Sequence, residues 1–128
     1  MNEQELKRRT KEFGLQVIRL IERLPNTKTG NLIGSQLLRS ATSVRANYRA
    51  ACRGRSKPDF ISKIGIVVEE ADESLYWLEI LYETGLIPQE ELALLMQECD
   101  ELIAILTATI KPARSNPTSY TKQSSTHG

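Results

Sequence analysis

The sequence predicts an all-α protein, an antiparallel up-down-up-down four-helix bundle with a disordered C-terminal tail. Four segments repeat apolar residues at alternating spacings of three and four, which is the period of one helix face. The connections between these segments are short, so neighbouring helices are expected to run antiparallel. Aromatic residues make up only 5% of the chain, and only seven glycines and five prolines occur among its 128 residues, a composition that disfavours a many-stranded β architecture.

The first two helices are bounded by turn-forming residues. The first is expected to end at Leu24, because the proline that follows pushes this residue out of helical geometry. Residues 25–30 predict a loop, and the second helix is expected from about Asn31 to Arg53, just before Gly54. Its apolar face repeats at the helical period, with Ile33, Leu37, Ala41, Val44, Tyr48 and Ala51.

The third helix is expected to begin near Pro58, because proline suits the first helical position. Ser56 or Asp59 could cap its start. Its end is predicted at Thr84, before Gly85. The apolar face of this helix consists of Phe60, Ile64, Val67, Ala71, Leu75, Leu78 and Tyr82.

The fourth helix is expected to begin at Pro88 and to stop at Pro112. We therefore assign residues 1–111 to the bundle. Residues 112–128 are rich in Ser, Thr, Asn and Pro, and they predict a disordered polar tail.

Several functional classes are disfavoured by residue counts. The only histidine is His127, and the two cysteines, Cys52 and Cys99, have no CxxC partner, so neither a catalytic site, a metal site nor a cofactor is expected. Both cysteines are predicted to pack in the core. The apolar run 102–110 is too short to cross a membrane, and the charged start lacks a signal peptide, which favours a cytoplasmic protein that is not an enzyme.

The charge is unevenly distributed along the chain. Residues 58–111 carry twelve acidic side chains against two lysines. Residues 25–57 carry seven basic side chains and no acid, namely Lys28, Arg39, Arg45, Arg49, Arg53, Arg55 and Lys57. Such an unbalanced segment needs an anionic partner or neighbour.

Two interpretations of the basic helix remain open. Its cations could follow the phosphates of a nucleic acid, since Arg45, Arg49 and Arg53 are four residues apart and lie along one side. Alternatively, they could pair with the acidic third and fourth helices, within the subunit or across to another, in a protein–protein interaction scaffold. The candidate nucleic-acid-binding residues are Arg39, Arg45, Arg49, Arg53, Arg55 and Lys57.

A polar stripe lies beside the apolar face of the second helix and consists of Gln36, Ser40, Ser43 and Asn47. Small hydroxyl side chains would let two helices approach closely and form hydrogen bonds across the contact. We interpret the stripe as an interhelix or subunit contact; the alternative is a surface that faces water.

Several motifs resemble those of the four-helix-bundle 23S ribosomal-RNA intervening-sequence proteins. The resemblance extends over about residues 6–110. It rests on the run from Gln36 to Tyr48 (QLLRSATSVRANY), on Asp59-Phe60-Ile61, on Glu69-Glu70-Ala71-Asp72-Glu73-Ser74 and on Tyr76-Trp77-Leu78-Glu79. One position departs, because Ala50 stands where the family usually has a glutamate.

The resemblance implies more than a fold. The family is similar to the accessory variability proteins of diversity-generating retroelements, which form homopentamers and bind RNA or DNA and a reverse transcriptase. We therefore expect a non-catalytic, homo-oligomeric accessory protein, pentameric by this resemblance. It is expected to bind nucleic acid, RNA more than DNA, through the basic second helix, and to assist a reverse transcriptase or a ribosomal-RNA process.

Overall fold

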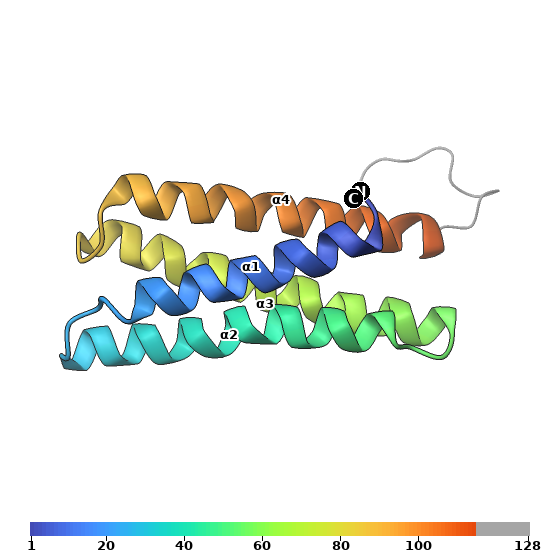
Figure 1. Cartoon of the computed structure of the whole chain (residues 1–128), viewed down its shortest axis with the longest axis horizontal. Helices are drawn as coiled ribbons and strands as arrows, with labels where there is room; N and C mark the ends of the chain where they lie inside the picture. The colour runs from blue at the N-terminus through green and yellow to red at the C-terminus, as the bar shows by residue number, and fades with distance from the viewer. Residues whose placement is uncertain (115–128) are drawn as a thin grey trace.

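A computed structural model of the chain describes the backbone of residues 1–114 and the side chains of residues 1–111. This part of the chain contains four helices and no strand: α1 (Glu3–Ile21), α2 (Lys28–Cys52), α3 (Lys57–Thr84) and α4 (Gln89–Arg114). Successive helices run in opposite directions (Figure 1). The predicted all-α up-down-up-down bundle is confirmed.

Side-chain caps begin three of the helices. The Asn2 side chain accepts a hydrogen bond from the Glu5 N–H at 2.8 Å, Thr27 Oγ1 accepts from Gly30 N–H at 3.0 Å, and Ser56 Oγ accepts from Asp59 N–H at 3.2 Å. Each bond satisfies a backbone donor that the first helical turn leaves free. Of the two predicted caps for α3, Ser56 is therefore the one that acts.

Three predicted helix ends were wrong by a few residues. Helix α1 ends at Ile21 rather than at Leu24, because the following N–H groups bond three residues back in a tighter turn. Helix α2 begins at Lys28 rather than at Asn31 because of the Thr27 cap. Helix α4 continues past Pro112 to Arg114, since proline removes one hydrogen bond but has a helical φ.

Residues 115–128 of the predicted tail lie outside the described residues.

Helix α3 ends as predicted, with Gly85 in the left-handed region at φ 77°, where glycine carries no steric penalty. None of the four helices, as far as Arg114, is long and apolar enough to cross a membrane.

The core runs along the bundle axis and uses every helix. Its largest fully buried side chains include Phe13, Leu37, Leu78, Leu92 and Leu106. Helix α2 packs between α1 and α3, and α4 packs on α3, whereas the direct contact between α1 and α4 is the smallest of the four. The predicted core positions of α2, from Ile33 to Ala51, are all buried.

Polar bonds join α1 to α4 where apolar contact is small. The Arg9 guanidinium donates two hydrogen bonds to Glu98, at 2.8 and 2.6 Å, and one to Glu101 at 3.0 Å. Its side chain is only 15% exposed. Nearer the other end of α1, Arg23 pairs with Glu91. These pairs hold the least packed helix boundary of the bundle together.

Candidate nucleic-acid interface

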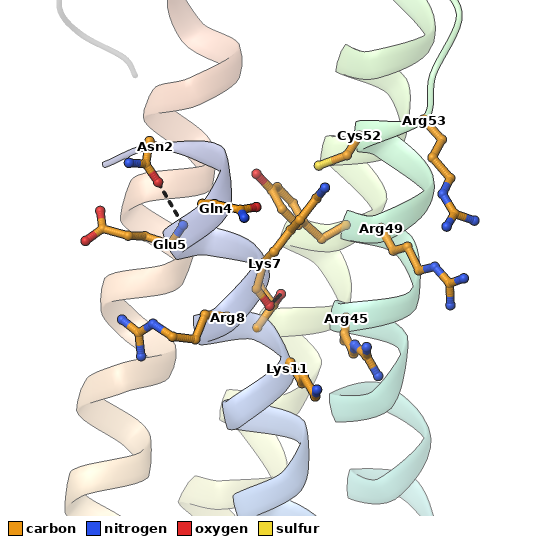
Figure 2. Close-up of a pocket in the computed structure, with 12 residues that line it drawn as sticks. Asn2, Gln4, Glu5, Lys7, Arg8, Lys11, Arg45, Arg49, Cys52 and Arg53 are labelled. Atoms are coloured by element: carbon orange, nitrogen blue, oxygen red, sulfur yellow. Dashed lines mark hydrogen bonds between the residues drawn. The ribbon is translucent and has the colours of Figure 1, made fainter.

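A groove of about 660 Å³ lies between the start of α1 and the end of α2 (Figure 2). Its lining includes six cationic side chains, Lys7, Arg8, Lys11, Arg45, Arg49 and Arg53, and one acidic side chain, Glu5. The groove is therefore strongly positive in a chain whose formal net charge is only +1. A positive groove raises the local concentration of anions.

Helical spacing places the cations in two rows. Arg45, Arg49 and Arg53 follow one another along α2 at steps of four residues, about 6 Å of helix axis each, and Figure 2 shows them one above the other. Lys7 and Lys11 lie on α1 with the same spacing. Arg8 points away from α2 in the same view and lies on the opposite flank of α1. One α2 row and one α1 row thus face a common groove.

The α2 arginines of this groove have no internal counter-ion. Within residues 1–111, Arg45, Arg49 and Arg53 form no ion pair, and neither does Lys11. Lys7 is the exception, with its ammonium 3.1 Å from the Glu3 carboxylate. Unpaired cations held side by side repel one another, and this repulsion is relieved when a polyanion binds.

The floor of the groove is neutral. Tyr48 is 3% exposed, and Cys52 is half-buried beside it. Burial raises the pKa of the Tyr48 hydroxyl and of the Cys52 thiol above their ordinary values. Both groups therefore stay protonated at neutral pH and do not offset the positive charge around them.

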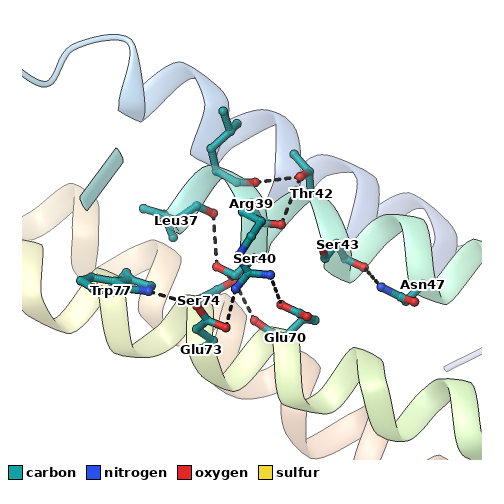
Figure 3. A network of polar contacts seen from close by, with 11 residues as sticks. Leu37, Arg39, Ser40, Thr42, Ser43, Asn47, Glu70, Glu73, Ser74 and Trp77 are labelled. Carbon is teal, nitrogen blue, oxygen red and sulfur yellow. Dashed lines mark hydrogen bonds and ion pairs between the residues drawn. The ribbon is translucent and has the colours of Figure 1, made fainter. Parts of the chain in front are cut away.

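Arg39 lies on the other flank of α2, away from the groove. Its guanidinium is 3.2 Å from Glu70 and 2.5 Å from Glu73 on α3 (Figure 3). Glu73 also accepts a hydrogen bond from the Trp77 indole at 3.4 Å. The bond from Arg39 holds the pKa of the Glu73 carboxyl below its ordinary value. Of the predicted nucleic-acid-binding residues, Arg39 is the one whose side chain forms an ion pair with the acidic third helix in the described part of the chain.

The two remaining predicted residues lie at the turn between α2 and α3. Arg55 and Arg53 line a second cavity there, of about 480 Å³, together with Asp59 and Lys63. Lys63 lies 2.8 Å from Asp59 and lowers the pKa of that carboxyl. Lys57 begins α3 and does not line the groove. Arg53 alone belongs to both cavities.

The cations of α1 were not among the predicted site residues. Lys7, Arg8 and Lys11 stand in a segment of mixed charge, where Glu3, Glu5 and Glu12 conceal them from a count of net charge. The spacing of four between Lys7 and Lys11 was the available signal. It becomes informative only once α1 is known to pack beside the arginine side of α2.

One member of the polar stripe lies inside the bundle. Ser40 is fully buried, and its hydroxyl accepts a hydrogen bond from Ser74 at 2.9 Å while donating to the Leu37 carbonyl at 3.3 Å. The Ser74 hydroxyl also lies 2.9 Å from the Glu70 carbonyl. Its single proton can therefore go to either acceptor. The structure brings Ser40 and Ser74 together across the α2–α3 contact.

The other three members of the stripe are half-buried along the same flank. The Asn47 side chain donates to the Ser43 carbonyl at 2.9 Å, a bond within its own helix (Figure 3). Gln36 lies one turn before Ser40 and is half-buried as well. The interhelix hydrogen bond of the stripe is thus made by Ser40.

The second cysteine lies in the core between α3 and α4. The Cys99 thiol is fully buried and donates a hydrogen bond to the Ala71 carbonyl at 3.1 Å. Burial raises its pKa to about 12. Among the described side chains, no group of three or more His, Cys, Asp and Glu residues is placed to hold a metal ion.

The comparisons with known proteins agree with the motifs of α2 and α3. Residues 2–108 match the family described as 23S rRNA-intervening sequence protein. The chain belongs to this family. No curated protein matches the sequence. A crystal structure of a protein with unknown function from the S23 ribosomal protein family of Bacteroides thetaiotaomicron is similar to this member of the intervening-sequence family, with 35% sequence identity and a TM-score of 0.78.

That similarity extends over most of both molecules. It covers 83% of this intervening-sequence protein and 98% of the Bacteroides chain. The bundle is therefore shared over nearly the whole length of the related structure. The resemblance of the family to retroelement accessory proteins remains a prediction.

Proposed function

We propose that this intervening-sequence protein is a non-catalytic accessory protein that binds nucleic acid through phosphate contacts in the α1–α2 groove. The observation that carries the proposal is the set of unpaired arginines, Arg45, Arg49 and Arg53, facing Lys7 and Lys11 around one cavity. Pairing with the acidic helices of the same subunit accounts for Arg39 but, within residues 1–111, for none of these three arginines; pairing with a neighbouring subunit is the alternative that the binding test below separates from RNA binding. The family's name refers to 23S rRNA, which favours RNA as the ligand and an rRNA-related process.

The expected mode of binding is electrostatic. Arginines at steps of about 6 Å along a helix suit successive phosphates of one strand, and each phosphate neutralised releases counter-ions. Affinity should therefore fall with salt at a log–log slope of about −0.7 to −0.9 per phosphate contact.

The test compares charge reversal inside and outside the groove. Fluorescence anisotropy with a labelled 23S rRNA fragment would measure affinity for the wild type, for Arg45→Glu/Arg49→Glu, and for a control, Arg19→Glu/Lys28→Glu. The control makes the same change in net charge on exposed residues outside the groove. We expect the groove variant to bind at least about 100-fold more weakly at low salt and the control to stay within about threefold.

Two results would contradict the proposal. One is a wild-type protein that fails to bind the fragment at low salt, and the other is an equal loss in the groove variant and its control. Circular dichroism would check that both variants keep the helical signal. A second readout is the alkylation of Cys52, which lines the groove and should react more slowly when RNA is bound.

We also propose that the protein self-associates, with five subunits as the resemblance implies. The outward side of α3 carries Ile66 at 40% exposure and Tyr76 at 52%, next to the half-buried Trp77 and Ile80. Apolar side chains grouped on an outer face favour a protein partner. Light scattering at micromolar concentration tests the idea, and a mass equal to the 14.4 kDa of one chain would contradict it.

A further inference from the structure

A smaller hollow of about 180 Å³, separate from the cavity at the α2–α3 turn, continues the α1–α2 groove along the helix boundary. Three cations, Lys11, Arg45 and Arg49, line both the hollow and the groove. The rest of the hollow is uncharged and consists of Gly14, Leu15, Ile18, Thr42 and Ala46. We call these five uncharged residues the slot. Arg45 and Arg49 therefore line both the positive groove and the hollow that contains the slot.

Apart from its three cations, the hollow is lined by small and apolar residues. Gly14 has no side chain, and a Cβ added there would meet the Ala41 carbonyl at 3.7 Å, so α1 and α2 are in van der Waals contact at this residue. Leu15 and Ile18 supply apolar surface from α1, and Ala46 leaves space on α2. The Thr42 hydroxyl bonds to the carbonyls of its own helix, at 2.7 Å to Leu38.

We infer that this hollow is a subsite for one unpaired nucleobase of a bound strand. The inference rests on the proposed function and names its ligand class as single-stranded nucleic acid. A planar base would lie against Leu15, Ile18 and Ala46, while its phosphates contact the arginines of the adjoining groove. A base inside a duplex is stacked and paired, so its faces are not available to such a slot.

Arg45 and Arg49 suit both parts of the ligand. A guanidinium is planar, stacks on flat π-systems and also binds phosphate oxygens. RNA-binding proteins use arginine planes as well as aromatic rings to hold unstacked bases. The two arginines can therefore act at the border between base and phosphate without an aromatic side chain in the slot.

The experiment separates the base from the phosphates. Three labelled ligands of equal length are compared by fluorescence anisotropy: a single-stranded RNA, the same strand with abasic sites throughout, and the corresponding duplex. The wild type should bind the single strand about fivefold more tightly than the abasic strand, which corresponds to roughly 40 Å² of apolar surface removed from water.

Filling the slot should remove that preference. Ala46 is exposed on α2, so Ala46→Leu adds volume without a change in charge and keeps a good helix former. We expect this variant to bind the single strand and the abasic strand equally, with the abasic affinity unchanged. The matched control, Ala104→Leu on the exposed side of α4, should keep the wild-type preference.

The outcomes distinguish the two proposals. Equal wild-type affinity for the single and abasic strands, or an Ala46→Leu variant that keeps the fivefold preference, would overturn the base subsite and leave phosphate binding intact. A wild type that binds the duplex more tightly than the single strand would also overturn the subsite. Failure of all three ligands to bind at low salt would instead overturn the proposed function.

Discussion

The two flanks of α2 differ in what the neighbouring helix offers them. On the α3 side, Arg39 meets Glu70 and Glu73, and Ser40 bonds with Ser74 (Figure 3). On the α1 side, Arg45 and Arg49 line the groove together with Lys7 and Lys11. The cations of one basic segment therefore differ in their surroundings. Arg39 forms ion pairs with α3, whereas Arg45, Arg49 and Arg53 form none within residues 1–111.

Like charges that face each other reduce the stability of the free protein. Two lysines of α1 and three arginines of α2 line one cavity, and their repulsion is an energetic cost that folding alone does not require. A local conflict of this kind is typical of a functional site. On the α3 side, Arg39 and Ser40 instead have partners within the fold.

The largest effect is expected at Ser40, on the flank of α2 that packs against α3. We call this side, with Arg39 and Ser40, the paired flank. Replacing this fully buried residue, as in Ser40→Leu, forces a larger side chain between α2 and α3 and should lower the free energy of unfolding by about 2–3 kcal/mol. Ser40→Ala should cost less than about 1 kcal/mol, because Ser74 still has the Glu70 carbonyl as an acceptor. Urea unfolding measures both.

Asn47→Leu is the matched control on the same stripe. Asn47 is half-buried and bonds within its own helix, so its replacement should change the free energy of unfolding by no more than about 0.5 kcal/mol. A cost for Asn47→Leu equal to that of Ser40→Leu would show that the buried contact extends along the whole stripe.

The next largest effect is expected in α1, where Arg9, which is paired, and Arg8, which is not paired in the described part of the chain, are adjacent. Arg9→Gln removes the hydrogen bonds to Glu98 and Glu101 and should lower the free energy of unfolding by about 2 kcal/mol. Arg8→Gln should leave stability within about 0.5 kcal/mol, because Arg8 forms no ion pair within residues 1–111. Urea unfolding measures both variants, and equal stability losses would contradict this difference.

The sequence was sufficient for the fold because the core is periodic. Apolar positions such as Leu37 and Leu78 recur every three or four residues, and all the predicted α2 core positions are buried. The helix ends were harder to place, since the Thr27 cap and the tightened turn after Ile21 depend on local hydrogen bonds. A proline at position 112 did not end α4.

The candidate site was only half predictable. The spacing of Arg45 and Arg49 shows that they share one side of a helix, but not which helix lies next to that side. Arg39 has the same charge and lies on the same helix, and only the positions of Glu70 and Glu73 on α3 separate it from the others. Lys7 and Lys11 joined the site through tertiary packing alone.

A smaller effect is expected on the salt dependence of RNA binding when one cation from each flank of α2 is replaced. Arg49→Gln should reduce the magnitude of the salt slope of RNA binding by about 1, as expected for one lost phosphate contact. Arg39→Gln should leave the slope unchanged, because its guanidinium is engaged by two carboxylates. In the absence of RNA, Arg49→Gln should raise the melting temperature slightly, since it relieves repulsion. Equal slopes for the two variants would remove the distinction between the flanks.

The smallest effect concerns the pH dependence of the paired flank. Hydrogen bonds, first from Arg39 and then from Trp77, hold the pKa of Glu73 below its ordinary value of 4.5. The folded state therefore binds this proton less readily than the unfolded state, so the stabilisation is present above pH 4.5 and is lost as the pH falls through the folded pKa.

Because the pair between Arg39 and Glu73 is partly exposed, the wild type should melt only about 1–2 °C above Arg39→Gln at pH 7. Melting curves by circular dichroism should show the difference shrinking as the pH falls below 4.5 and disappearing once the Glu73 carboxyl is protonated in the folded state. The pair between Asp59 and Lys63 responds to acid in the same direction, but it is present in both proteins and cancels in the comparison. A difference that stays constant from neutral to acidic pH would show that Arg39 stabilises the bundle through packing of its side chain rather than through its charge.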